Sequence, residues 1–392
     1  MAKIVFLAQR VPWPPDRGDK ITTWRLLERL GRRHEVHTLV FAHGREDELA
    51  AEALRSKGYR ITTVPWDART QKLRALPLLL TSKPITLGVY GSARLQAEVD
   101  RAVQGADVAY AYSSSMGAFL LDHAHLRRVM HFAELDSDKW RQYAARSHGP
   151  MRWLWSREAR TLLEFERRIA AAFDASILCT PLEQEVFARY IPGVDSLVLR
   201  NGVDLDYFRP HRQARRETEL VFTGVMDYEP NVDGVEWFAR DILPLIRQRV
   251  PAARFTIVGS KPVERVQRLA AIEGVTVTGR VEDVRAYVHA AAVSVAPLRI
   301  ARGIQNKVLE AMACGVPVVG TTSATQGVEC VAGRDLLVRD TAADFADEVV
   351  RLLQDPLEAE ALGARGRALV EERYAWERVL QPLDALVTKL IG

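Results

Sequence analysis

The sequence predicts an α/β protein with two parallel sheets, each covered by helices. Short runs of apolar, often β-branched residues recur along the chain, and segments with helical spacing separate them. These runs are apolar throughout and do not alternate with polar residues, as expected of parallel strands buried on both faces. The pattern occurs on either side of a charged, turn-rich segment at residues 195–218. We therefore predict two α/β domains joined by a linker in that segment.

Twelve strands follow from these runs. In the first half they are expected at residues 3–8, 35–40, 60–65, 107–112, 128–133, 175–180 and 196–199, and in the second half at residues 219–224, 254–259, 275–279, 293–298 and 316–321. Amphipathic spacing predicts helices that include residues 21–34 and 231–250. Residues 374–392 are predicted to form a last amphipathic helix that Pro382 kinks or breaks in two.

Length and composition fit a globular protein of the cytoplasm. The chain has 392 residues, 48% of them hydrophobic, which is enough for two domains with a core each. It has no run of 18 or more apolar residues, and we expect neither a spanning helix nor a signal peptide at its start. The three cysteines, Cys179, Cys314 and Cys330, show no paired spacing, which favours a reducing compartment over a disulfide framework or a zinc site.

The positive charge is concentrated in the first half of the chain. Residues 1–200 hold 30 Lys and Arg against 23 Asp and Glu, a net charge of +7, whereas residues 201–392 hold 24 against 27, a net charge of −3. Residues 139–173 also interleave tryptophans with arginines. An anionic membrane or a lipid-linked substrate is a better match to this pattern than nucleic acid, for which no motif is present. An ordinary solvated surface, with the tryptophans packed inward, is the alternative.

A helix with two different faces is predicted at residues 306–314. Gly315 is placed as its C-terminal cap, and Val308, Leu309, Met312 and Ala313 form its apolar face. Asn306, Lys307 and Glu310 share another face because they are spaced three or four residues apart. The backbone amides from Gly303 through Ile304 and Gln305 to Asn306, with the Lys307 cation, would bind an anion. Glu310 would accept hydrogen bonds from a diol such as a ribose; a merely solvated helix face is the alternative.

The segment "LEAMACGVPVVGT" from Leu309 resembles the signature of the retaining glycosyltransferases of family 4, also called glycosyl transferases group 1. The resemblance implies the GT-B fold, in which two Rossmann-like domains face each other across a cleft and a C-terminal helix crosses back to the first domain. It predicts an acceptor-binding domain at residues 1–199, a nucleotide-sugar-binding domain at residues 200–373 and the crossing helix at residues 374–392.

Further segments resemble the family in the same order along the chain. They are "NGVDLDYFRP" from Asn201, "GVTVTGRVEDVRAYVHAAAVSVAPL" from Gly274, "GRDLLV" from Gly333 and "ERYAWERV" from Glu372. By this resemblance Gly279, Arg280 and Val281 contact the nucleotide base. Glu310 matches the second of two family glutamates, the one that binds the ribose. Arg302 stands where the first, sugar-contacting glutamate is expected, and would instead bind the diphosphate or an anionic sugar.

The family's phosphate-binding residues are only partly present. Gly18 matches one glycine of the N-terminal turn near the donor, and Gly224 matches the glycine before two cations that Val225 and Asn231 replace. We therefore expect Lys261, Arg302 and Lys307 to supply the positive charge. These departures, together with "DSDKW" from Asp136, resemble the sugar transferases associated with PEP-CTERM and exosortase exopolysaccharide loci.

Acceptor contacts are expected in the first half. Asp19 and Lys20 stand at the start of a helix, where Asp19 is also a candidate N-cap. Asp136 and Asp138 are placed in a loop after a strand, with Lys139 beside them, whereas His131 within that strand is interpreted as a core histidine. Asp136, Asn306 and Lys307 are the predicted catalytic residues.

The predicted activity is retaining transfer of a hexose from a nucleotide-diphosphate sugar to a glycan or lipid-linked acceptor, in exopolysaccharide or cell-surface polysaccharide biosynthesis. We expect no metal and no cofactor, because donors aimed at the leaving phosphate would stabilise its charge directly. The predicted location is cytoplasmic, with peripheral contact to an anionic membrane. Two alternatives are a nucleotide-sugar epimerase or hydrolase, which needs no acceptor, and a binding subunit without turnover.

Overall fold

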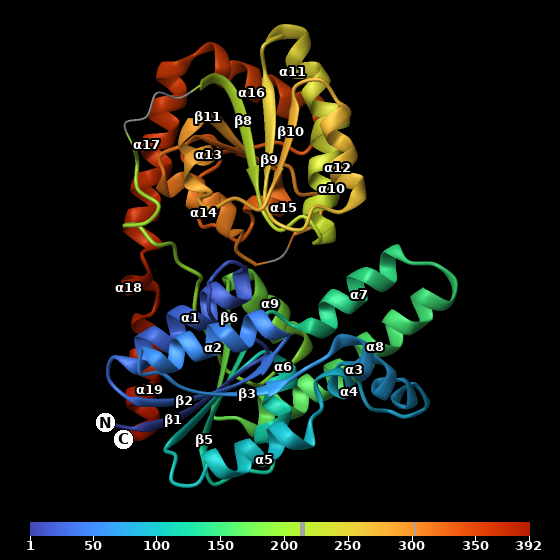
Figure 1. Cartoon of the computed structure of the whole chain (residues 1–392), viewed down its shortest axis with the longest axis vertical. Coiled ribbons are helices and arrows are strands. Elements are labelled where there is room, and N and C mark those ends of the chain that lie inside the picture. Colours follow the sequence, from blue (N-terminus) through green and yellow to red (C-terminus); the bar gives the residue numbers. More distant parts are fainter. Residues whose placement is uncertain (212–215, 302) are drawn as a thin grey trace. The chain divides into compact units, whose positions relative to one another are not determined.

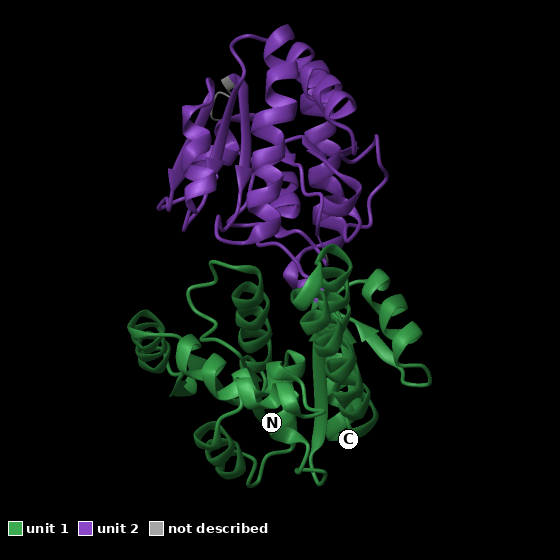
Figure 2. Ribbon diagram, turned by 90° about the vertical axis from the view of Figure 1, so that its right-hand side faces the viewer, with its two compact units in different colours: residues 1–200, 380–392 green, residues 201–379 purple. Residues whose placement is uncertain are grey.

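The chain forms two compact units in a computed structural model, which describes residues 1–211, 216–301 and 303–392 (Figure 1). Unit 1 comprises Met1–Arg200 and Leu380–Gly392, and unit 2 comprises Asn201–Val379 (Figure 2). The division thus falls one residue after the position expected from the sequence. The C-terminal part of the chain belongs to unit 1 from Leu380 onward, six residues later than the expected Tyr374.

Unit 1 is built on a seven-stranded parallel sheet with the order β3-β2-β1-β4-β5-β6-β7. The strands are β1 Lys3–Ala8, β2 Glu35–Ala42, β3 Arg60–Pro65, β4 Val108–Tyr112, β5 Arg127–Ala133, β6 Ala175–Leu178 and β7 Ser196–Val198. Leu7 of β1 is in register with Leu39 of β2 and Ala111 of β4. These apolar strands are buried between helices, so the carboxyl edge of the sheet is left for polar side chains.

The helices of unit 1 include one from the far C-terminus. They are α1 Gly18–Gly31, α2 Arg45–Ser56, α3 Ala68–Ala75, η1 Leu76–Leu80, α4 Ile85–Tyr90, α5 Ala93–Ala102, α6 Ser114–Gly117, η2 Ala118–Leu120, α7 Asp136–Arg146, α8 Gly149–Ala172, α9 Pro181–Tyr190 and α19 Gln381–Ile391. Arg29 on α1 donates to both carboxylate oxygens of Asp384 on α19, with its closest nitrogen 2.6 Å from Oδ2. This two-pronged ion pair fastens α19 to unit 1.

Unit 2 has a six-stranded parallel sheet with the order β10-β9-β8-β11-β12-β13. The strands are β8 Arg216–Thr223, β9 Arg254–Val258, β10 Val275–Gly279, β11 Ala291–Ala296, β12 Val318–Gly320 and β13 Leu337–Val338. The helices are α10 Glu229–Trp237, η3 Phe238–Ile242, α11 Leu243–Arg249, α12 Glu264–Gln267, η4 Arg268–Ala271, α13 Arg285–Ala290, α14 Asn306–Ala313, α15 Thr322–Thr325, α16 Ala342–Gln354, α17 Pro356–Arg373 and α18 Trp376–Val379.

Each of the twelve predicted strands overlaps an observed strand, and only the two-residue β13 was not predicted. The last predicted helix is broken in two, because α18 ends at Val379 and α19 begins at Gln381 with Pro382 in its first turn. The apolar face predicted for residues 306–314 is also confirmed, since Val308, Leu309, Met312 and Ala313 are buried.

Two local predictions in unit 1 were wrong. Asp136 and Asp138 were expected in a loop, but they form the first turn of α7. Carboxylates are favourable there because the helix N-terminus carries partial positive charge. Asp19 was a candidate N-cap, but α1 begins one residue earlier, at Gly18, and its N-cap position is Arg17. Asp19 therefore lies in the first turn.

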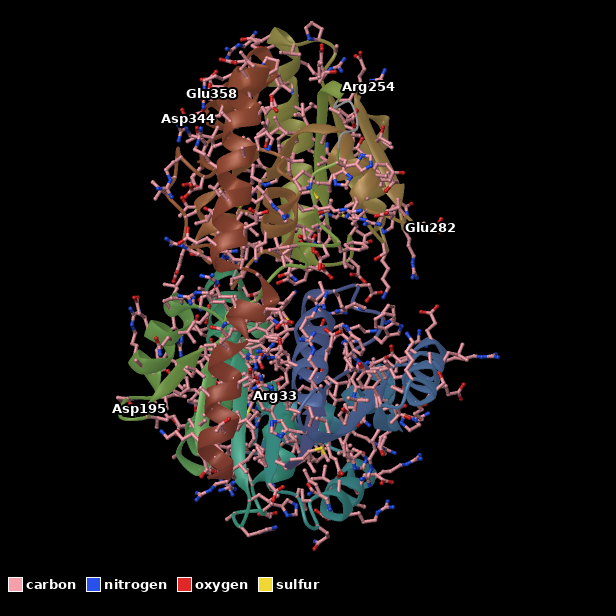
Figure 3. All side chains as sticks on the ribbon, turned by 90° about the vertical axis from the view of Figure 1, so that its left-hand side faces the viewer. Arg33, Asp195, Arg254, Glu282, Asp344 and Glu358 are labelled. Atoms are coloured by element: carbon pink, nitrogen blue, oxygen red, sulfur yellow. The ribbon has the colours of Figure 1, made fainter. Side chains whose placement is uncertain are left out.

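The outer surface carries the charged side chains. Arg33 and Asp195 of unit 1 and Arg254 and Glu282 of unit 2 are exposed and project from the ribbon (Figure 3). Among the described residues, no helix combines the length and apolar character that crossing a bilayer requires.

Candidate active site

The chain order of the unit 2 sheet reverses between β8 and β11, the position at which parallel sheets usually bind ligands. Two segments that follow these strands meet there. Nζ of Lys307, on α14 after β11, donates a hydrogen bond of 2.6 Å to Oδ1 of Asn231, on α10 after β8. Nδ2 of Asn231 in turn donates to the carbonyl oxygen of Val225 at 2.8 Å. Asn231 thus fixes the position of the Lys307 amine.

Glycines bring the backbone close to this amine. A Cβ placed on Gly224 would lie 2.7 Å from Nδ2 of Asn231 and 3.3 Å from Nζ of Lys307. A Cβ on Gly259 would overlap the carbonyl oxygen of Gly224, so the loops after β8 and β9 are in backbone contact. The Lys307 amine also lies 4.3 Å from the ring centroid of Phe222. Lys307 therefore places a cation beside Gly224, where the sequence has Val225 and Asn231 in place of cations.

Helix α14 has no side-chain cap at its start, whereas hydrogen bonds satisfy its end. The N-cap residue Gln305 makes no side-chain capping bond. At the other end, Gly315 has a φ of 69°, its amide donates to Met312 at 2.9 Å, and the amide of Val316 donates to Ala311 at 3.0 Å. This is a Schellman cap, as Gly315 predicted. A side-chain nitrogen of Arg367 donates to the carbonyl of Ala313 at 2.6 Å, which satisfies one more helix carbonyl.

Burial changes the ionisation of the polar face of α14. Burial lowers the pKa of Lys307 to about 7, although the Glu310 carboxylate partly opposes this shift. Burial raises the pKa of Glu310 to about 7, partly opposed by Lys307. Oδ1 of Asn306 is buried and accepts no hydrogen bond from the described part of the chain. The helix start can therefore gain both charge stabilisation and hydrogen bonds from an anionic, polar ligand.

The other predicted donor residues of unit 2 follow the carboxyl ends of its strands. Lys261 follows β9 and is exposed, and Gly279, with a φ of 69°, ends β10 before Arg280 and Val281. Gly303, with a φ of 62°, leads through Ile304 and Gln305 into α14. Parallel strands place all of these at one edge of the sheet. Arg302 lies outside the described residues, and Gly18, also predicted to be near the donor, belongs to unit 1.

Unit 1 has its own reversal of chain order, between β1 and β4, and side chains connect the two strand ends there. Nε2 of Gln9 donates to the hydroxyls of Ser113 at 2.9 Å and Ser115 at 2.8 Å. The hydroxyl of Ser114 donates to Oδ2 of Asp136 at 3.0 Å. The ends of β1, β4 and β5 thus form one polar cluster that includes the predicted Asp136.

The predicted acceptor residues lie near this cluster but differ in their availability. Lys20 is buried in an ion pair with Asp47, 3.1 Å between Nζ and Oδ1. Asp138 is also buried and accepts hydrogen bonds from Arg141 and Gln142 of its own helix. Both charges are therefore already compensated within unit 1.

Three of the remaining predicted charges act on the half-buried Tyr90. Burial raises the pKa of the Tyr90 phenol, and the charges of Arg10, Asp136, Asp19 and Lys139 also act on it. The charges of Asp19, Asp136 and Lys139 thus all act on one phenol on α4. Tyr90 further stacks on Trp66, with ring centroids 5.7 Å apart.

Two buried titratable groups lie behind the cluster. Burial raises the pKa of Glu166 on α8 to about 8, with the Asp136 charge as a further cause, and the Ser137 amide donates to its Oε1 at 3.3 Å. Burial lowers the pKa of His131 to about 3, and its Nδ1 lies 2.7 Å from the Tyr110 hydroxyl. His131 is therefore a neutral core residue, as the sequence indicated.

Several of these residues were not singled out from the sequence. Gln9 could have been found, because it is the first polar residue after β1. Tyr90 could not have been found from the sequence, because it lies on a helix that carries no motif. The contact of Lys307 with Asn231 joins residues that are 76 positions apart. Among the described residues, no three His, Cys, Asp or Glu side chains are grouped so as to hold a metal ion.

Comparison with known families and proteins gives consistent results. Residues 217–355 match the family described as Glycosyl transferases group 1. The chain is 30% identical over 265 residues to a GDP-mannose-dependent alpha-(1-6)-phosphatidylinositol monomannoside mannosyltransferase of Mycobacterium tuberculosis, covering 61% of this chain and 67% of that protein. A related mannosyltransferase of Corynebacterium glutamicum is 30% identical over 200 residues, and the match spans 52% of its length. The chain thus spans between one half and two thirds of these curated relatives.

Solved structures resemble the whole chain. Sucrose-phosphate synthase from Thermosynechococcus elongatus has a TM-score of 0.73 at 18% identity, covering 100% of this chain and 99% of that one. Anabaena HepE in complex with UDP and glucose has a TM-score of 0.70 at 14% identity, covering 99% and 100%. At these identities the likeness concerns the fold, which is GT-B with two Rossmann-like domains.

Proposed function

The chain belongs to the glycosyl transferases group 1 family of GT-B glycosyltransferases, and from this premise we propose that it transfers a hexose from a nucleotide-diphosphate sugar to a glycan or lipid-linked acceptor. GDP-mannose is the first donor to consider, because the curated relatives named above are GDP-mannose-dependent. UDP-glucose is the second, because HepE was solved with UDP and glucose.

One observation carries the proposal: the Lys307 amine is held by Asn231 beside Gly224 at the switch point of unit 2. Loss of the sugar leaves negative charge on the departing nucleoside diphosphate, and a fixed cation nearby lowers the energy of the transition state. In this proposal Lys307 and the amides that begin α14 stabilise that charge. Glu310, one turn further along, accepts hydrogen bonds from the ribose hydroxyls.

We propose that the sugar keeps its anomeric configuration and that no metal takes part. The bond between the anomeric carbon and the phosphate oxygen breaks, and its electron pair leaves with the diphosphate. The acceptor hydroxyl attacks from the same face, and its proton passes to the departing phosphate oxygen. Oδ1 of Asn306 is buried and has no hydrogen-bond partner among the described residues. It is a candidate to accept a hydrogen bond from the nucleotide sugar.

The acceptor side of the proposal concerns unit 1. The charges of Asp19, Asp136 and Lys139 act on Tyr90, and Trp66 stacks on that ring, so this part of unit 1 combines charged and aromatic groups. The named relatives act on phosphatidylinositol mannosides, which supports a lipid-linked acceptor and work at a membrane surface. A role in exopolysaccharide assembly remains part of the proposal.

The proposal is tested by incubating the purified protein with GDP-mannose or UDP-glucose, with and without a lipid extract, and identifying the products. We expect labelled sugar in the lipid fraction with one donor, and none with Glu310→Gln at limiting donor. Sugar released or converted without acceptor would instead indicate a hydrolase or epimerase. Nucleotide binding without any product would indicate a binding subunit.

A further inference from the structure

One corner of unit 1 exposes a group of large apolar side chains. Leu73 of α3 is 66% exposed, and Leu76 and Leu80 of η1 are 53% and 93% exposed. None of the five residues of η1 is buried. Surface leucines at such exposure are ordinary when single, but three within eight residues on the turns of one short segment are not.

The start of α8 belongs to the same corner. A side-chain nitrogen of Arg157 donates to the carbonyls of Leu78, Thr81 and Lys83, which ties the η1 segment to α8. Trp153 lies one helical turn before Arg157 on the same face and is 60% exposed. α3, α4 and α8 accordingly lie at one side of unit 1 (Figure 1).

The other tryptophans of α7 and α8 pack against each other and are not exposed like Trp153. Trp140 of α7 stacks on Trp155 of α8 with ring centroids 4.7 Å apart and planes 14° apart. These two rings hold the α7–α8 hairpin together, as the inward-packing interpretation predicted. Trp153 has no such ring partner among the described residues and is left at the surface.

Most charged residues in the two segments that carry the apolar side chains are positive, although Asp67, Asp138 and Glu158 stand at their ends. Residues 68–83 contain four Lys or Arg and no Asp or Glu, and residues 139–157 contain five and none. Six of these cations are exposed and form no ion pair with a described residue: Arg69, Lys72, Arg74, Lys83, Arg146 and Arg152. This corner therefore carries positive charge that no described carboxylate compensates by an ion pair.

We infer that this corner, formed by residues 73–80 and the α8 segment around Trp153, docks unit 1 onto an anionic lipid bilayer. Leucine side chains and a tryptophan enter the boundary between headgroups and acyl chains, while unpaired Lys and Arg side chains contact the anionic headgroups. A protein partner with an apolar patch would not require six unpaired cations around it. The inference rests on the proposed function only for its purpose, which is to bring the enzyme to a lipid-linked acceptor.

The experiment is cosedimentation of the whole protein, without any nucleotide, with phosphatidylcholine vesicles that contain either 30% or no phosphatidylglycerol. We expect binding to the anionic vesicles and at least about tenfold weaker binding to the neutral ones, with added salt reversing the difference. The double substitution Leu76→Asp/Leu80→Asp should weaken binding to the anionic vesicles by at least about tenfold.

Leu357→Asp is the control, because Leu357, on α17 of unit 2, is 80% exposed, a value between those of Leu76 and Leu80. It should bind vesicles like the unchanged protein. All variants should keep the same thermal unfolding midpoint, since the substituted side chains are exposed.

The inference is overturned if the double variant binds anionic vesicles as well as the Leu357→Asp protein does, or if the unchanged protein binds neither vesicle type. It is also overturned if the protein is a dimer that the double substitution makes monomeric, because a second copy would then cover the corner. Failure of sugar transfer with intact vesicle binding would contradict the proposed function and leave this inference standing.

Discussion

Lys307 is a lysine whose charge depends on its surroundings. Its side chain is half-buried, and its amine lies over the Phe222 ring and has a neutral hydrogen-bond partner in Asn231. Burial therefore lowers its pKa to about 7. A bound diphosphate would restore the charge by supplying two or more negative oxygens. The residue is thus set to become fully charged when the donor binds.

This arrangement predicts a pH dependence of nucleotide binding. The lysine cation is present below a pKa of about 7 and is lost as the pH rises through it, so affinity for the nucleoside diphosphate should fall between pH 7 and pH 9. Binding above pH 7 should also take up a proton. Lys307→Arg should reduce both effects because arginine stays charged, and the part that remains belongs to Glu310, whose pKa is also about 7. Calorimetry in buffers of different ionisation enthalpy measures the affinity and the proton uptake together.

Glu166 should make unit 1 less stable as the pH rises. Burial raises its pKa to about 8, so the folded protein holds a proton that the unfolded chain releases above about pH 4.5. The contribution of Glu166 to the free energy of unfolding therefore falls as the pH rises from about 4.5 to about 8, and it is constant above that. Glu166→Gln should be close to neutral at pH 5 and more stable than the unchanged protein at pH 9 by up to several kcal/mol. Thermal unfolding of both proteins at the two pH values tests this, and an equal difference at both would contradict it.

At the scale of elements, α14 depends on how it ends as much as on how it begins. Gly315 occupies the left-handed region, and a Cβ there would meet only Pro210, at an ordinary 3.6 Å. The cost of a side chain is therefore conformational and not steric. The Schellman cap fixes the axis of α14 and with it the position of Lys307.

Gly315→Ala should accordingly destabilise unit 2 by about 1–2 kcal/mol. Gly31→Ala is the matched control, since Gly31 ends α1 with open space around it and no left-handed backbone. That change should be neutral or slightly stabilising. Urea unfolding followed by circular dichroism gives both values, and an equal midpoint for the two variants would refute the assignment of strain to Gly315.

The same elements explain what could be predicted from the sequence. The strands were predictable because buried parallel strands are apolar on both faces, which is a local property. β13 has only two residues and leaves no such pattern. The first turn of α7 was assigned to a loop because Asp136 and Asp138 come just after a strand, although carboxylates are favourable at a helix start.

At the scale of the whole molecule, each unit carries a polar cluster at the point where its strand order reverses. The sequence predicted Lys307 and Glu310 near a donor from the polar face that they share on one helix, and Gly224 from its resemblance to a glycine of the family. It could not show that Asn231, which stands where a cation was expected, instead orients a lysine from another helix. Nor could it show that Lys20 and Asp138 are already paired within unit 1. Such contacts depend on tertiary packing, and one sequence contains no direct record of them.

The most direct test of the central claim is calorimetric titration of GDP and UDP into three proteins: the unchanged chain, Lys307→Met and Lys389→Met. Lys389 is an exposed lysine on α19 and serves as the control. Because a charge-assisted hydrogen bond contributes roughly 1.5–3 kcal/mol, Lys307→Met should bind the preferred diphosphate at least about tenfold more weakly. Lys389→Met should bind it like the unchanged chain. Equal affinity of the Lys307→Met and Lys389→Met proteins would contradict the assignment of the diphosphate site to α14.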